Sequence, residues 1–207
     1  SSLLWASFPC QDLSLAGLRG GIHELRSGAF WSFWNVVRSQ EASPATAPII
    51  VLENVVGLVS SGEGKDFAQV IRRLRLDGYE AGALIVDAAK FLPHSRKRLF
   101  IIAVQRTLLE GLPGVSSVPS TTWHPSVLTK AVDALHPEDR AAWLWWSPPL
   151  PSQFVPTLSP LLDKGKAVKW DSKETTEKIL SLMWPAQRTK LQELVAKKKN
   201  WVGSLVM

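Results

Sequence analysis

Two residues that can do chemistry together each follow a short apolar run in the first quarter of the chain. Cys10 comes after a mostly apolar run at residues 3 to 8, and Glu53 comes after the apolar residues 49 to 52. A cysteine thiolate is a strong nucleophile, and a protonated carboxyl group can act as a general acid. A pyrimidine ring needs both groups if its C5 is to become nucleophilic. The sulfur adds to C6, and it can do so once N3 is protonated or hydrogen-bonded.

Both apolar runs are predicted to be buried strands. Short continuous apolar stretches are typical of parallel strands covered on both faces, although periodicity alone does not distinguish them from buried helix. The segment between the runs carries an apolar stripe with helical spacing, formed by Phe30, Phe33, Trp34 and Val37. A strand, helix, strand unit makes the two strands parallel, so both carboxyl ends emerge at one edge of the sheet. If these strands are neighbours about 5 Å apart, Cys10 and Glu53 can both contact one small planar substrate.

Three motifs in order resemble those of the DNA cytosine-5 methyltransferases. They are Phe8-Pro9-Cys10-Gln11 with Ser14 and Gly17, then Glu53-Asn54-Val55, and finally Ser95-Arg96-Lys97-Arg98-Leu99-Phe100. Each motif alone is weak, but their order, spacing and strand-end placement agree over roughly residues 3 to 104. The resemblance implies an α/β fold: a partial Rossmann-like class I methyltransferase sheet whose first strands are missing, followed by a mostly helical or irregular C-terminal region.

The resemblance implies a role for each residue of the catalytic motifs. Cys10 is expected to attack C6, and Glu53 to engage N3 and the exocyclic amine. Asn54 is expected to hold the geometry of the strand end. Arg96 and Arg98 are expected to steady the site, and we assign the contact with the base carbonyl to Arg98.

Contacts with a cofactor and with DNA are implied in the same way. Pro9 and Phe30 are expected to touch S-adenosylmethionine. The positions expected to contact DNA are Gln11, Ser14 and Arg19. Residues 12 to 28 correspond to the family's mobile loop over the target base, and their glycines suit a hinged lid. The plainer interpretation of this segment is an ordinary glycine-rich surface loop.

Two features depart from the family pattern. His94 stands where the family usually has a glutamine before the arginine pair, and we assign it no catalytic role. The glycine-rich loop that binds the cofactor, which lies upstream of these motifs in the family, is not found in the chain. We therefore expect a truncated chain that does not necessarily bind cofactor or fold stably alone, since missing central strands would expose a sheet edge.

The chain after Glu53 predicts a helix and a hairpin. An apolar helical stripe is formed by Phe67, Val70, Ile71 and Leu74, and the arginines on the other face are Arg72, Arg73 and Arg75. We interpret these arginines mainly as solvated surface. Residues 82 to 88 and 99 to 104 are predicted strands of an antiparallel edge hairpin, which would bring Arg96 and Arg98 near the rim.

The composition changes near residue 107 towards proline and tryptophan. We assign residues 1–106 to a partial methyltransferase catalytic domain and residues 107–207 to the start of a target-recognition region. Helices are expected over roughly 172 to 184 and 186 to 199. The clustered tryptophans are Trp123, Trp143, Trp145 and Trp146. Such a cluster can stack on bases, but we favour a role in the core.

Composition restricts the class of protein. The 207 residues carry a net charge of +6, which suits a polyanionic partner such as double-stranded DNA. One cysteine excludes an internal disulfide, and the four histidines lack a ligand-like spacing, so no metal is expected. No apolar segment reaches the roughly 20 residues that span a bilayer, so we expect no membrane contact and a cytoplasmic protein, bacterial or phage-type and nucleoid-associated. We also expect a monomer.

The predicted reaction is methyl transfer from S-adenosylmethionine to C5 of a flipped cytosine in duplex DNA, through a covalent bond between Cys10 and C6. A restriction-modification enzyme would have this activity. Two alternatives stay open. One is the same chemistry on cytosine in tRNA, and the other is a non-catalytic remnant that binds DNA.

Overall fold

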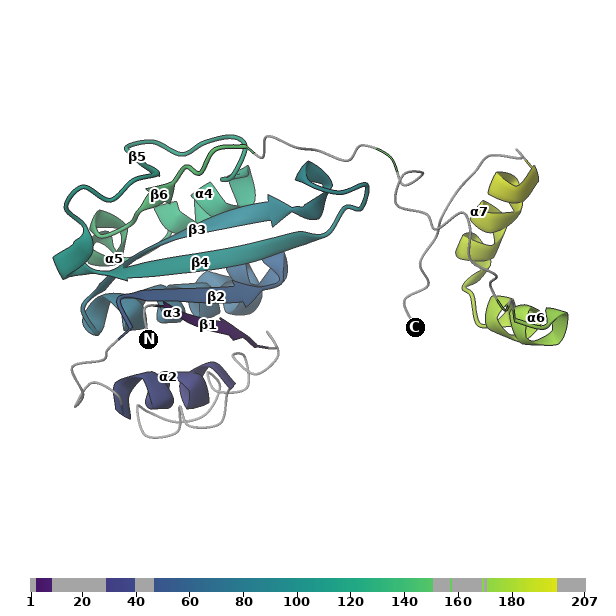
Figure 1. Cartoon of the computed structure of the whole chain (residues 1–207), viewed down its shortest axis with the longest axis horizontal. Helices are drawn as coiled ribbons and strands as arrows, with labels where there is room; N and C mark the ends of the chain where they lie inside the picture. The colour runs from purple at the N-terminus through teal and green to yellow at the C-terminus, as the bar shows by residue number, and fades with distance from the viewer. Residues whose placement is uncertain are drawn as a thin grey trace. The chain divides into compact units, whose positions relative to one another are not determined.

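The computed structural model describes residues 3–8, 29–39, 47–150, 157, 169 and 171–196. The chain divides into two compact units, Ser1–Leu161 and Leu162–Met207. Among the described residues, the strands belong to the first unit and two helices belong to the second (Figure 1).

The first unit is built on a four-stranded sheet with the order β1-β2-β4-β3. Strands β1 (Leu3–Ser7) and β2 (Ile49–Asn54) are parallel neighbours, and the register aligns Ser7 with Glu53. The predicted parallel pair is therefore confirmed. Because aligned residues in paired strands project to the same face, Ser7 and Glu53 stand side by side where the two strands end.

The predicted hairpin is also confirmed, with longer strands than expected. Strands β3 (Tyr79–Asp87) and β4 (Lys97–Gln105) pair antiparallel, and β4 lies between β3 and β2. The antiparallel pairing of β4 with β2 places Leu99 opposite Asn54. The start of β4, which carries Arg98 and directly follows Arg96, therefore lies at the same edge of the sheet as the end of β2.

One face of the sheet is covered by helices. Helix α2 (Ala29–Ser39) buries Phe30, Trp34 and Val37, and helix α3 (Lys65–Leu76) buries the whole predicted apolar stripe. Helix α4 (Ser126–Asp133) adds Leu128 and Val132 to the same core. The helical spacing read from the sequence thus identified the residues that pack on this face.

Short helical turns complete the connections of the first unit. Helix α5 is Pro137–Ala141, and the 3-10 turns are η1 (Val56–Val59), η2 (Ser61–Gly64), η3 (Ala88–Lys90) and η4 (Arg106–Leu108).

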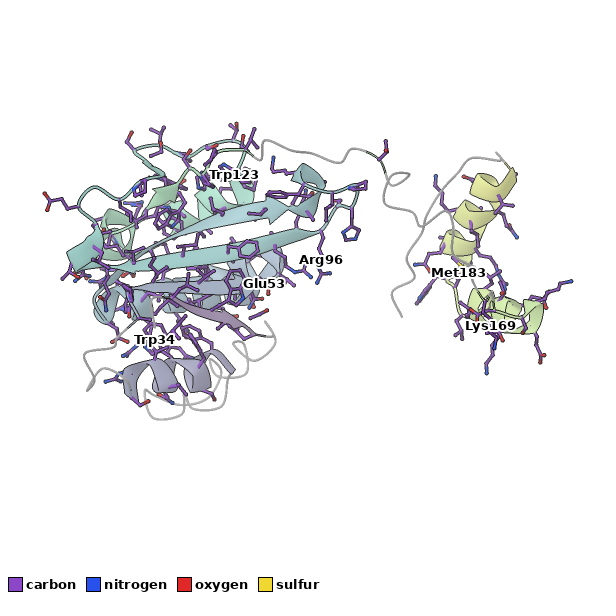
Figure 2. The ribbon with its side chains drawn as sticks, in the orientation of Figure 1. Trp34, Glu53, Arg96, Trp123, Lys169 and Met183 are labelled. Carbon is purple, nitrogen blue, oxygen red and sulfur yellow. The ribbon has the colours of Figure 1, made fainter. Side chains whose placement is uncertain are left out.

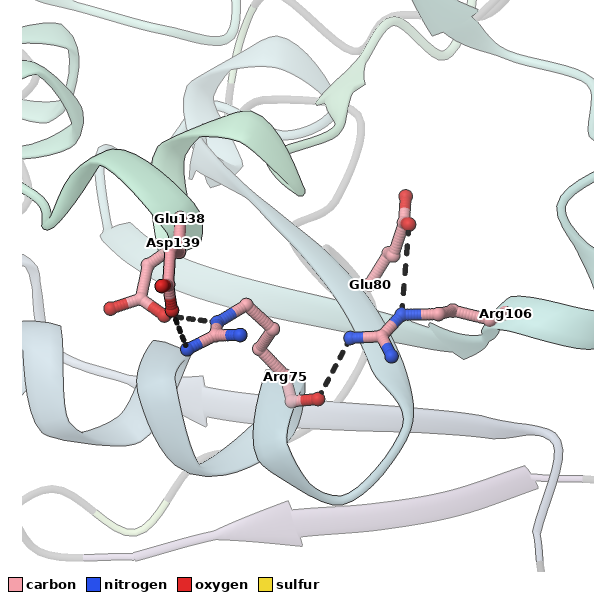
Figure 3. A network of polar contacts seen from close by, with 5 residues as sticks. All are labelled: Arg75, Glu80, Arg106, Glu138 and Asp139. Carbon is pink, nitrogen blue, oxygen red and sulfur yellow. Dashed lines mark hydrogen bonds and ion pairs between the residues drawn. The ribbon is translucent and has the colours of Figure 1, made fainter.

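The prediction that the arginines of α3 are solvated surface is wrong for two of them. Arg73 pairs in bidentate fashion with Asp77, at 2.6 and 2.7 Å. Arg75 donates to Asp139 at 2.5 Å and to Glu138 at 2.9 Å, and its side chain is only 18% exposed (Figure 3). Asp139 is buried, and a buried carboxylate without a partner would destabilise the fold. The ion pair with Arg75 removes that cost. Arg75 therefore ties α3 to α5.

The segment after residue 107 covers part of the other face of the sheet. Strands β5 (Val115–Ser116) and β6 (Trp145–Trp146) form a two-stranded antiparallel sheet. Trp123 and Trp146 form a second apolar cluster with Leu84 and Val104. The Trp146 Nε1 donates to the carbonyl of Ile102 at 3.1 Å. Because Trp123, Trp143 and Trp146 are all buried, the expectation that these tryptophans serve the core is confirmed for them.

Gly82 allows this segment to approach the sheet closely. The Leu144 N–H donates to the Ala81 carbonyl at 2.9 Å, next to a parallel bridge between Ala81 and Trp143. A Cβ atom at position 82 would lie 1.8 Å from the Leu144 carbonyl oxygen. Only glycine fits where the two backbones come this close.

The second unit contains α6 (Lys173–Ser181) and α7 (Pro185–Ala196), close to the two predicted helical stretches. Ser172 caps α6 by accepting a hydrogen bond from the Thr175 N–H at 3.1 Å, as helix N-termini favour. Pro185 begins α7, the position where proline costs no hydrogen bond. In the part of the chain that the structure describes, no helix combines the length and apolar character needed to cross a bilayer.

Candidate active site

A cavity of about 350 Å³ opens where β1 and β2 end and β4 begins. Its lining is Ser7, Phe8, Glu53, Asn54, Val55, Arg96 and Arg98. Glu53 and Arg96 are labelled at this end of the sheet in Figure 2. The volume lies at the lower end of the range of small-ligand pockets. The strand topology therefore brings the second and third sequence motifs to one pocket.

Both oxygens of the Glu53 carboxylate have donors. The Ser7 hydroxyl donates to Oε2, and the Nε of Arg98 lies 3.0 Å from Oε1. The side chains of Glu53 and Arg98 are 21% and 23% exposed, so the pair is partly shielded from water. Charge-assisted contacts of this kind orient a carboxylate more strongly than neutral hydrogen bonds do. Glu53 is thus held at the pocket by groups from two neighbouring strands.

Asn54 joins the ends of β1 and β2. Its Nδ2 donates to the carbonyl of Phe8 at 2.8 Å, and its Oδ1 accepts from the Val55 N–H at 2.8 Å. The side chain is 4% exposed, so these hydrogen bonds are shielded from competing water. This is the geometry that the role expected of Asn54 requires, and the role itself stays a prediction.

Asp87 organises the loop that carries Arg96 and leads into β4. Its Oδ1 accepts from the backbone N–H groups of Ala89 and Arg96, at 3.0 and 2.9 Å, and its Oδ2 accepts from the Ser95 hydroxyl at 2.9 Å. These donors, chiefly the Ala89 N–H, lower the pKa of Asp87 below its ordinary value. The carboxylate therefore fixes where the chain turns into β4.

The two arginines differ in what they contact. Arg98 is engaged with Glu53, and its Nη1 also donates to the Lys97 carbonyl at 2.8 Å. Arg96 lines the pocket and is exposed, and among the described residues its guanidinium has no hydrogen-bond partner. His94, also exposed, lies in the same connecting loop. The assignment of the base carbonyl to Arg98 stays a prediction.

Several predicted site residues lie outside the described residues. They are Pro9, Cys10, Gln11, Ser14 and Arg19, together with the proposed lid at residues 12 to 28. Phe30, expected at the cofactor, is described and is 0% exposed. Its ring centroid lies 5.5 Å from that of Phe8, 4.9 Å from Trp31 and 5.8 Å from Trp34. Its contact with a cofactor stays a prediction.

Sequence reasoning missed Ser7 and Asp87. Ser7 carried a signal, because it is a polar residue near the end of the first apolar run, as Glu53 is in the second. Asp87 carried another, because an aspartate that ends a strand before a turn commonly accepts backbone hydrogen bonds. Within the described ranges, no group of three or more side chains is placed to hold a metal ion.

Comparison with known proteins identifies the family. The family described as C-5 cytosine-specific DNA methylase matches residues 1–154. This match covers most of the chain, so the protein belongs to that family, and its α/β sheet is part of the predicted class I methyltransferase fold.

Curated relatives match a shorter stretch. Type II methyltransferase M.MspI from Moraxella sp is 34% identical over 102 residues, which are 49% of this chain and 23% of that protein. Type II methyltransferase M.HpaII from Haemophilus parainfluenzae is 32% identical over 108 residues, which are 51% of this chain and 29% of that protein. A crystal structure of S. pombe Dnmt2 methyltransferase is 25% identical, covers 50% of this chain and 29% of that one, and has a TM-score of 0.33. The chain spans about a quarter of the length of these curated relatives.

Proposed function

We propose that the full-length protein carrying this chain methylates C5 of cytosine in double-stranded DNA, with S-adenosylmethionine as methyl donor. The observation that carries the proposal is the position of Glu53. Its carboxylate is held by Ser7 and Arg98 at the end of β2, beside the strand that leads into the Pro-Cys-Gln motif. Membership of the cytosine-5 DNA methylase family supports the same reaction.

In this proposal the residues of the chain act on the nucleobase. The Cys10 sulfur forms a bond to C6, while Glu53 engages N3 and the exocyclic amine so that the ring can accept the electron pair. C5 gains that electron density and becomes the nucleophile. After methylation, C5 loses its proton and the bond between sulfur and C6 breaks, which restores the thiolate. Arg96 and Arg98 offer fixed positive charge to the base carbonyl.

The donor itself supplies an electrophilic methyl group. Of the two residues expected to touch it, Phe30 is 0% exposed and Pro9 lies outside the described residues. In the proposal the full-length protein binds the cofactor, and the roles of Pro9 and Phe30 in that binding stay predictions.

The target base has to leave the helical stack for this attack. Extrusion costs a few kcal/mol, which contacts in the pocket must offset. A pocket of about 350 Å³ lined by a carboxylate and two guanidinium groups provides hydrogen-bonding partners for one base. The net charge of +6 favours association with the DNA backbone.

The proposal includes the setting of the reaction. The curated relatives named above are bacterial type II methyltransferases. We infer a restriction-modification role, a monomer, and a cytoplasmic, nucleoid-associated protein.

Covalent trapping tests the reaction. Duplex DNA that contains 5-fluorocytosine is incubated with the full-length protein and S-adenosylmethionine, and the adduct is measured on a denaturing gel. We expect an adduct with the wild type, none with Cys10→Ala, and a reduction of at least about 100-fold in its rate of formation with Glu53→Gln.

Two controls make this result specific. Glu80→Gln makes the same change near the amino end of β3, at the opposite edge of the sheet from the pocket, and should leave trapping unchanged. Fluorinated tRNA offered in competition separates the substrates. Adducts with tRNA alone would replace DNA with RNA in the proposal, and an adduct that survives Cys10→Ala would reject the proposed nucleophile.

A further inference from the structure

We propose that Ser7 is a positioning residue of the pocket, whose hydroxyl holds the Glu53 carboxylate in the orientation needed by the nucleobase. This inference deepens the proposed function and rests on it for the identity of the base. Ser7 acts through Glu53 and has no assigned contact with the reacting atoms.

The backbone places Ser7 where it can do this. Ser7 and Glu53 are aligned partners in the parallel pair of β1 and β2. Such partners project from the same face of a sheet, with their strands about 5 Å apart. The serine side chain is short and the glutamate side chain is long. The two can therefore meet only if the Glu53 side chain bends back towards β1.

The two donors act on different oxygens. Arg98 contacts Oε1 from β4, on one side of β2, while Ser7 donates to Oε2 from β1, on the other side. A glutamate side chain has three rotatable bonds, and a single contact leaves rotation about the remaining bonds. Contacts from both neighbouring strands define the plane of the carboxylate as well as its position.

The chemistry of the hydroxyl suits this task. A carboxylate has about four acceptor sites on its two oxygens, so one donor on each leaves acceptor capacity facing the pocket. Ser7 carries no charge, so it adds an orienting hydrogen bond without a second cation that would compete for the carboxylate. Both Ser7 and Glu53 line the cavity, so the oriented group meets a bound base directly.

Kinetics of the full-length protein on duplex DNA test the consequence for the reaction. Ser7→Ala should lower kcat about tenfold, because Glu53 loses a hydrogen bond to its charged carboxylate. KM for DNA should stay unchanged, because the lost bond lies within the pocket. Ser7→Thr keeps the hydroxyl and should restore most of the rate. Ser39→Ala, which removes an exposed hydroxyl at the end of α2, is the matched control. An unchanged kcat in Ser7→Ala, or no rescue by threonine, would overturn the inference.

A double-mutant cycle tests the contact without any need for activity. The free energy of unfolding is measured for the wild type, Ser7→Ala, Glu53→Ala and the double variant. We expect the two changes to be non-additive, since each removes one partner of the same hydrogen bond. Additive effects would reject the contact. Non-additive effects in a protein that forms no adduct with fluorinated DNA or tRNA would instead support the positioning role and reject the proposed reaction.

Discussion

The Asn54 side chain donates a hydrogen bond to the carbonyl of Phe8 at 2.8 Å, and this bond links the ends of two parallel strands. Phe8 is two positions before Cys10, and Asn54 directly follows Glu53. The two residues expected to act on one base are therefore connected through a single buried amide.

Replacing Asn54 with aspartate should weaken this link. The carboxylate would face the Phe8 carbonyl without a proton to donate, and a buried acceptor left unsatisfied costs about 1–3 kcal/mol. We expect that loss in urea unfolding, together with slower trapping of fluorinated DNA. Asn35→Asp on the exposed face of α2 is the control. Equal stability of the two variants would show that the Asn54 amide does not hold the strand ends.

Gly82 should not tolerate a side chain. Alanine would place its Cβ 1.8 Å from the Leu144 carbonyl oxygen, so one of the two backbone segments would have to move. Overpacking of this kind costs about 1–3 kcal/mol or more. Gly57→Ala, where the nearest atom to a new Cβ is 3.9 Å away, should be close to neutral. Thermal unfolding of both variants checks the difference, and a matching melting temperature would contradict the close approach.

Asp87 should make the stability of the loop between β3 and β4 sensitive to acid. Hydrogen bonds from Ala89, Ser95 and Arg96 lower its pKa in the folded state, so the unfolded chain binds more protons in the acid range. Its contribution to stability is complete above the ordinary aspartate pKa of about 4 and is lost as the pH falls through the lower, folded value. Asp87→Ala should remove that part of the pH dependence in unfolding measured across the acid range. The same slope in wild type and variant would argue against this role.

His124 should make the first unit less stable in mildly acidic solution. Burial lowers its pKa, and its Nδ1 accepts a hydrogen bond from the Ser120 N–H at 2.8 Å, which requires the unprotonated nitrogen. Below about pH 6.5 the unfolded chain takes up a proton more readily, so the free energy of unfolding should fall. His124→Gln should flatten this dependence between neutral and mildly acidic pH. His136→Gln, at an exposed position, should not, and equal effects of both would contradict the prediction.

The elements of the sheet could be predicted because each is encoded locally. Continuous apolar runs marked β1 and β2, and helical spacing marked α2 and α3, so each pattern could be read within a dozen residues. The approach of the arginine pair to the end of β2 followed from the same patterns, because a parallel pair and an antiparallel hairpin bring strand ends together.

Side-chain pairing depended on information that the local pattern lacks. Arg75 was assigned to solvent because its own helix gives it no partner, whereas its acidic partners Glu138 and Asp139 come from a helix more than 60 positions away. Ser7 was missed for a related reason. Its contact with Glu53 depends on the register of two strands, and a shift by one residue would turn the serine to the other face.

The tryptophan-rich segment that lies over the sheet has a practical consequence for anyone who shortens this gene. A protein that ends at residue 106 would lack Trp123 and Trp146, which pack on Leu84 and Val104. The apolar surface of the sheet beneath them would then be exposed to solvent. The carbonyl of Ile102 and that of Ala81 would also lose donors from that segment. Expression of residues 1 to 161 together would keep this apolar surface buried and reduce aggregation.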